Sequence, residues 1–299
     1  MELSWSTKLR IAGSVGAGVV LIGIIGWPLA RPSEPFAPVQ VANLGLADGV
    51  VLVVLAFVAG LAGYFISWPN GLEIGILAVP SGLAIWGVRT GNIASLLQQS
   101  PSFEQREALL AALKWEPIFW LAIVGVGLGA VYCGGKLRPT PVKVGEGSGA
   151  KPFSQRHLNS IVALAGCTFI AYFALNILVQ DVRLVNEGAA SVVGQPATGQ
   201  IVFGVVVAFG FAAFLAKSFL NSGYMCPIIA TAVVHPVAIV VSYRSDVLFH
   251  LTRSWPAVFF PNSVVAILPL QMVAFGTIGS IAGYWMGVRY NFQRKHAIR

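Results

Sequence analysis

Residues Gly49–Ser67 read GVVLVVLAFVAGLAGYFIS, and none of them carries a charge. A helix that crosses the hydrocarbon core of a bilayer needs about 20 mostly apolar residues, so this stretch predicts a membrane-spanning helix. Seven more stretches of the same kind occur. The eight predicted spans are Ile11–Ala30, Gly49–Ser67, Gly71–Val88, Pro117–Gly134, Ser160–Val179, Ile201–Leu220, Tyr224–Tyr243 and Ser263–Val288. The third is short and contains Pro80, so a re-entrant segment is the alternative there.

The composition supports a polytopic, all-α membrane bundle. Of the 299 residues, 56% are hydrophobic and 10% are charged, and the mean hydropathy is +0.77. Soluble domains carry about 25% charged residues, so this chain is too apolar for a cytoplasmic enzyme or a DNA-binding module. Cys133, Cys167 and Cys226 lie in or beside apolar spans without a CxxC pair, which predicts neither a disulfide framework nor a metal site.

The distribution of basic residues predicts the orientation, because loops rich in Lys and Arg stay in the cytoplasm. With the N-terminus inside, the inner segments contain only Glu2 and Glu146 as acids. Their basic residues are Lys8, Arg10, Lys136, Arg138, Lys143, Lys151, Arg156, Lys217, Arg289, Arg294, Lys295 and Arg299. We therefore expect both termini in the cytoplasm and a bacterial inner (plasma) membrane location. The first apolar run is too long for a signal peptide, so we expect a retained helix.

The two halves of the chain resemble each other at an offset of 152 residues. Identical pairs include Phe57 with Phe209 and Gly71 with Gly223, and the loop lengths follow the same order in both halves. This indicates a parallel tandem repeat of two four-helix units, residues 1–138 and 159–299, joined by a basic cytoplasmic linker, 139–158. The alternative is that apolar composition alone produces the identities.

Small residues recur every fourth position in two predicted spans, which lets membrane helices approach closely. Packing inside the chain is one use of such faces, and contact with a partner subunit is the other. The residues are Gly204, Ala208 and Ala212 in the sixth span and Gly279, Gly283 and Gly287 in the eighth.

The predicted outer segment Arg89–Glu116 is too long for a simple turn. Ser102 followed by Gln105 resembles a capping box, and the residues after it form an apolar stripe. We expect an amphipathic helix lying on the outer membrane interface, with a shorter counterpart after Ser245. These segments, like the small-residue faces, are candidate contacts for partner subunits.

Polar residues inside predicted spans are the candidates for a functional site. His235 lies near the middle of the seventh span, before Pro236, and Thr231 shares its helical face. Gln271 is placed at similar depth in the eighth span, and Glu73 stands in the first turn of the third. The alternative for His235 is a buried side chain that only bonds between helices, and for Glu73 a structural role at the helix start.

Three functions remain open from the sequence. The first is a non-catalytic anchor, scaffold or assembly subunit whose partners are the bilayer and other membrane subunits. The second is a small permease for an uncharged or apolar substrate, with a path between the repeats. The third is an enzyme acting on lipid with His235 as base, which lacks an orienting carboxylate. No cofactor, metal or nucleic acid is expected.

Overall fold

The computed structural model describes residues 4–32, 34, 37–139, 153–184 and 191–297. Most of these residues are helical; η1 is a π-helix, and η2 and η3 are 3-10 helices. In chain order the elements are α1 (Trp5–Gly18), η1 (Val19–Ile25), α2 (Trp27–Ala30), η2 (Val41–Asn43), α3 (Leu46–Ile66), α4 (Gly71–Ile74), η3 (Gly75–Leu77), α5 (Ala78–Arg89), α6 (Ile93–Gln99), α7 (Phe103–Leu137), α8 (Phe153–Leu178), β1 (Arg183–Leu184), β2 (Val192–Val193), α9 (Thr198–Leu220), α10 (Met225–Ser242), α11 (Ser245–Thr252) and α12 (Pro269–Ala297).

Seven helical segments are long and apolar enough to cross a bilayer, which indicates an integral membrane protein. They are Trp5–Ile25, Leu46–Ile66, Gly71–Arg89, Phe103–Leu137, Leu158–Leu178, Thr198–Leu220 and Met225–Ser242. The third, divided between α4, η3 and α5, has the length of a full crossing. The helix α8 begins at Phe153, inside the segment predicted as linker; residues 140–152 of that linker lie outside the described residues.

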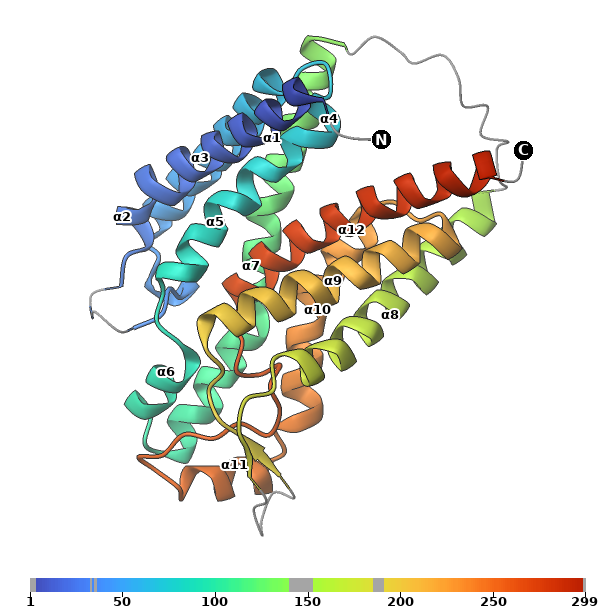
Figure 1. Cartoon of the computed structure of the whole chain (residues 1–299). Helices are drawn as coiled ribbons and strands as arrows, with labels where there is room; N and C mark the ends of the chain where they lie inside the picture. Colours follow the sequence, from blue (N-terminus) through green and yellow to red (C-terminus); the bar gives the residue numbers. More distant parts are fainter. Residues whose placement is uncertain (1–3, 33, 35–36, 140–152, 185–190, 298–299) are drawn as a thin grey trace.

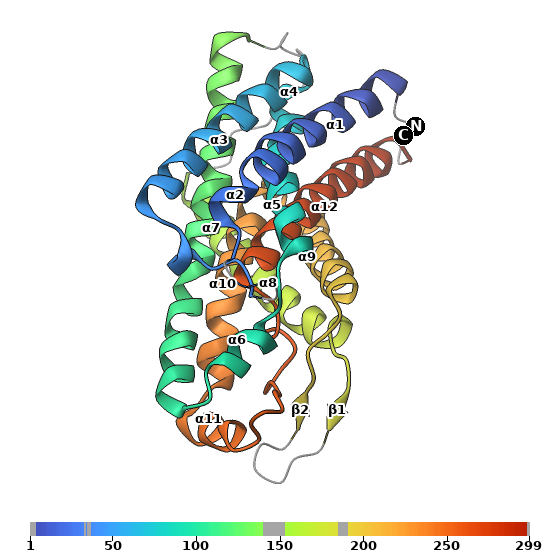
Figure 2. The same cartoon turned by 90° about the vertical axis from the view of Figure 1, so that its left-hand side faces the viewer.

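The start of α1 and the end of α12 lie at the same end of the bundle, which we call the terminal end (Figure 1). At the opposite end, the loop end, lie α6, α11, the antiparallel pair β1–β2 and the first turns of α7 (Figure 2). We call these elements, with residues 253–268, the loop-end layer.

The eighth predicted span differs most from expectation. It was expected to begin at Ser263, but residues 263–268 form a buried turn segment and α12 begins at Pro269. This helix is less apolar than the seven candidate spans. The reason is that α12 packs against α5, α7, α9 and α10, so its first half, residues 269–281, is almost entirely buried against other helices. A helix in that position does not need a uniformly apolar surface.

Glycines bring α9 and α12 into backbone contact. A Cβ atom placed on Gly283 would lie 1.9 Å from the carbonyl oxygen of Gly210, and one on Gly279 would lie 2.3 Å from that of Val206. On the other side of α9, a Cβ on Gly204 would lie 2.3 Å from a methyl group of Val179. The small-residue faces therefore pack within the chain.

The prediction of a separate interfacial helix in Arg89–Glu116 is wrong. The capping box of Ser102 and Gln105 is present, but the helix that it starts continues through Pro117 as the 35-residue α7. At 1.5 Å per residue α7 is about 52 Å long, against a hydrocarbon core of about 30 Å. Its first turns therefore extend into the loop-end layer. The expected shorter counterpart is present as α11, which buries Leu248 and Leu251.

Candidate functional site

His235 and Thr231 are the most enclosed of the polar candidates, and only His235 is without a hydrogen-bond partner among the described residues. The His235 side chain is fully buried, and neither ring nitrogen has a hydrogen-bond partner within the described part of the chain. Thr231 lies one turn earlier on the same face of α10, which continues as helix through Pro236. A Cβ atom on Gly276 would lie 2.6 Å from a methyl group of Thr231. This face of α10 is therefore directed toward α12.

The same stripe of α10 also contacts the first half of the chain. Ile228 and Ala232, at i−7 and i−3 from His235, belong to this stripe. Ile228 packs in an apolar cluster with Tyr64 and Val131, and Ala232 in another with residues of α3 and α5. His235 thus lies on the stripe of α10 that faces the junction of the two halves.

Other hydroxyl groups near this junction differ in how they are satisfied. The Thr231 hydroxyl donates to the carbonyl oxygen of Ile228 at 2.6 Å. The buried hydroxyls of Thr277 and Ser280 on α12 have no hydrogen-bond partner within the described parts of the chain. With His235 they make up a set of buried polar groups that have no partner, each in an apolar interior where an unsatisfied polar group is costly.

Gln271 and Glu73 do not join this set. The Gln271 side-chain amide donates to the carbonyl oxygen of Gly87 at 2.9 Å and accepts from the Leu268 N–H at 3.2 Å. It therefore ties the start of α12 to the last turn of α5, whose final carbonyls have no partner within that helix. Glu73 is exposed in α4, at the terminal end of the bundle.

Arg106 is a buried charge that is not among the site residues predicted from the sequence. It is 2% exposed, and its guanidinium donates to the carbonyl oxygens of Ser100 (2.9 Å), Leu251 (3.2 Å) and Leu97 (3.4 Å). It thereby caps α11 and the end of α6, which come from the two halves of the chain. The signal was its helical spacing from Phe103 and Leu110, which places it on the apolar stripe.

Glu116 is the second buried charge that sequence reasoning missed. One carboxylate oxygen accepts from the Val41 N–H at 2.8 Å and from the Trp120 indole N–H at 3.3 Å. The carboxylate holds the segment after α2 against α7. Trp120 is itself fully buried and meets Trp86 edge to face, so these two tryptophans pack in the core instead of facing the lipid interface.

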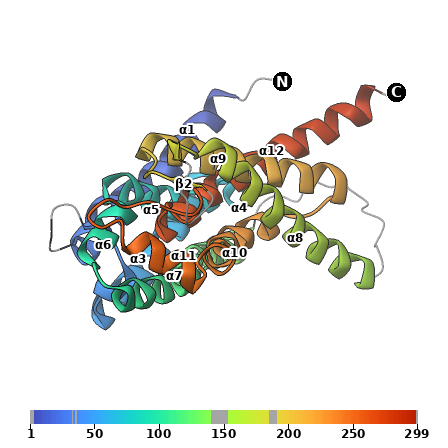
Figure 3. The same cartoon turned by 90° about the horizontal axis from the view of Figure 1, so that it is seen from below.

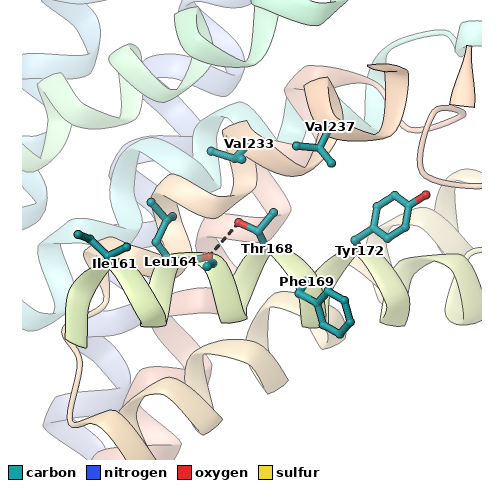
Figure 4. Close-up of a pocket in the computed structure, with 8 residues that line it drawn as sticks. Ile161, Leu164, Thr168, Phe169, Tyr172, Val233 and Val237 are labelled. Atoms are coloured by element: carbon teal, nitrogen blue, oxygen red, sulfur yellow. Dashed lines mark hydrogen bonds between the residues drawn. The ribbon is translucent and has the colours of Figure 1, made fainter. Parts of the chain in front are cut away.

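Two apolar grooves open on the sides of the bundle. One, of about 480 Å³, runs between α8 and α10 (Figure 4). The Thr168 hydroxyl in it donates to the Leu164 carbonyl at 2.9 Å, so it adds no free donor to the lining. The other groove, of about 520 Å³, lies between the end of α5 at Val88 and α9. The first is lined by Ile161, Leu164, Ala165, Thr168, Phe169, Tyr172, Val233 and Val237.

The three cysteines are free thiols: Cys133 is exposed, Cys167 is buried and Cys226 is half-buried. Within the described ranges, no group of three His, Cys, Asp or Glu side chains is arranged to hold a metal ion. No family model, curated protein or solved structure matches the chain.

Proposed function

We propose that this protein is a non-catalytic, membrane-embedded subunit that anchors or assembles partner membrane proteins. The observation that carries the proposal is the way α12 is fixed at the centre of the bundle. It touches the backbone of α9 at Gly210 and is tied to α5 by the bond from Gln271 to Gly87. Close packing of this kind resists deformation, which suits a scaffold.

The groove between α8 and α10 is the surface proposed to receive a transmembrane helix of the partner. Ala165 and Phe169 repeat at i, i+4 along one wall, and Val233 and Val237 do so along the other. Side chains in such rows form the ridges between which a third helix packs. Small residues such as Ala165 allow that helix to approach closely.

The test is purification of the full chain from its native membranes in a mild detergent, with mass spectrometry of all proteins that co-migrate. We expect a stoichiometric membrane partner. Ala165→Trp, which fills the groove, should lose that partner, whereas Ile177→Trp on the lipid-exposed side of α8 should retain it. A particle that contains only this chain would contradict the proposal.

The proposed topology is a parallel tandem repeat with both termini in the cytoplasm of a bacterial inner membrane. The helix contacts support the repeat. In the first half α1 packs against α3 and α5, and α3 against α7; in the second half α8 packs against α9 and α10, and α9 against α12. The repeat matches α1, α3, α5 and α7 with α8, α9, α10 and α12. Under this match, the contact of α5 with α12 between the halves corresponds to the contact of α10 with α7.

A permease for a small uncharged substrate is the second candidate. It is favoured by the buried imidazole of His235 and the unpartnered hydroxyls of Thr277 and Ser280, on or near the junction where a path would run. Its test is uptake of neutral solutes by vesicles that contain the purified chain. Uptake that is abolished by His235→Leu, in a protein that still folds, would favour the permease over the scaffold.

A further inference from the structure

The last turns of α12 extend past the end of α9 at the terminal end (Figure 1 and Figure 3). The final contacts between the two helices involve Lys217: a Cβ atom on Gly287 would lie 2.8 Å from its Cβ, and the Asn291 side chain donates to its carbonyl oxygen at 3.3 Å. Residues 292–296 are all exposed. This segment continues a helix that packs at the centre of the bundle, so its position is fixed by the fold.

Apolar and basic side chains alternate along this extension. Met286, Tyr290 and Phe292 are each about half exposed or more, Arg289 is exposed between them, and Arg294 and Lys295 are exposed beyond them. Basic side chains reach the phosphate level of a membrane while apolar ones enter the acyl boundary, so this mixture fits the headgroup region better than bulk water.

Cations at this end of the bundle lie on aromatic rings. The Lys217 ammonium is 5.1 Å from the ring centre of Tyr284, and the Arg138 guanidinium is 4.0 Å from that of Trp68. Aromatic side chains concentrate at membrane–water interfaces, which places these cations at headgroup level. Among the described residues, Glu73 is the only acid at the terminal end. The described basic residues there are Lys8, Arg10, Lys136, Arg138, Lys217, Arg289, Arg294 and Lys295.

We propose that the terminal end, and the α12 extension in particular, binds the phosphate headgroups of anionic lipids in the leaflet that it faces. The charge complementarity and the interleaved exposed aromatics select a lipid surface as the occupant. The inference is independent of whether the chain acts as a subunit or a permease, because it concerns only the end of the bundle and not its centre.

The test uses the full chain in a neutral detergent, titrated with phosphatidylglycerol or phosphatidylcholine and followed by native mass spectrometry. We expect tighter binding of phosphatidylglycerol. A basic residue near a membrane surface contributes about fivefold to affinity, so Arg294→Gln with Lys295→Gln should weaken it about 25-fold and leave phosphatidylcholine unchanged. The matched control is Arg244→Gln with Arg253→Gln, which removes two exposed charges at the loop end. This control should change the affinity for phosphatidylglycerol less than twofold.

Two further measurements distinguish a lipid headgroup from free phosphate as the ligand and test the electrostatic binding without any substitution. Inorganic phosphate at the same concentration should not displace phosphatidylglycerol; displacement would assign the site to free phosphate and overturn the proposal. In the unmodified chain, raising NaCl from about 0.05 to about 0.5 M should weaken phosphatidylglycerol binding selectively. An unchanged affinity in the α12 variant, an equal loss in the control, or salt-independent binding would each contradict a headgroup surface.

Discussion

The bundle and the loop-end layer of this protein are held together by different forces. Where α9 and α12 cross, glycines place backbone against backbone, and apolar side chains fill the surrounding space. In the loop-end layer, the buried guanidinium of Arg106 holds helix ends through directed hydrogen bonds, and further along α7 the buried carboxylate of Glu116 holds the segment after α2 in the same way. The comparison shows that close packing without charge can position the spans, whereas short, irregular segments need polar contacts to fix their backbone groups.

The largest expected effect is at the crossing of α9 and α12. Gly283→Leu should destabilise the bundle by more than about 3 kcal/mol, because any Cβ there overlaps the Gly210 carbonyl. Unfolding by SDS titration measures the loss. Gly125→Leu is the matched control, since no atom outside its own helix lies within 4 Å of the added Cβ. Equal behaviour of the two variants would show that the crossing is not tight.

Arg106→Ala should cost about 3 kcal/mol, and the damage should stay within the loop-end layer. Three carbonyls lose their charged donor, so α6 and α11 should become sensitive to limited proteolysis while the helical content of the bundle is kept. Arg253→Ala removes an exposed cation of the same layer and should have little effect. Unchanged proteolysis of the Arg106 variant would show that Arg106 does not hold α6 and α11 in place.

Gln271→Leu should cost about 1–2 kcal/mol, because the Gly87 carbonyl and the Leu268 amide lose a buried partner. The same SDS titration measures it, with the exposed Gln293→Leu on the same helix as control. A loss no larger than that of the control would mean that the α5–α12 contact depends on apolar packing alone.

His235→Leu should have the smallest effect, within about 1 kcal/mol in either direction. Replacing a buried polar group that has no partner by an apolar one of similar size is close to neutral. The melting temperature of the detergent-solubilised variant checks this. A loss of several kcal/mol would reveal a hydrogen bond at His235 and would favour a polar site at the junction.

Hydropathy predicted most of the bundle, because a span in lipid must be long and apolar whatever it packs against. It misplaced the start of the eighth span, since the buried turn at 263–268 is more apolar than the helix after it. A hydropathy profile reports the length and polarity of a segment but not its backbone conformation, so it does not distinguish a buried turn from a helix.

The loop-end layer was predicted less well, for a different reason. The capping box at Ser102 located the start of α7, but the helix was expected to lie on the membrane interface within Arg89–Glu116, whereas it continues past Glu116. Arg106 and Glu116 were not singled out from the sequence, because their partners are backbone groups of distant segments, near Leu251 and Val41. Such contacts depend on tertiary structure; the spacing of Arg106 from Phe103 and Leu110 indicates its burial but not its partners.

The most direct test of a rigid, closed centre is hydrogen–deuterium exchange of the full chain in lipid nanodiscs. Amides of α12 from 269 to 283, and those of α10 around His235, should exchange more slowly than those of α6 and α11, because they open only when the bundle unfolds. Exchange of α10 and α12 as fast as that of α6 and α11 would show water at the junction of the two halves. That result would contradict the scaffold and point to a moving path.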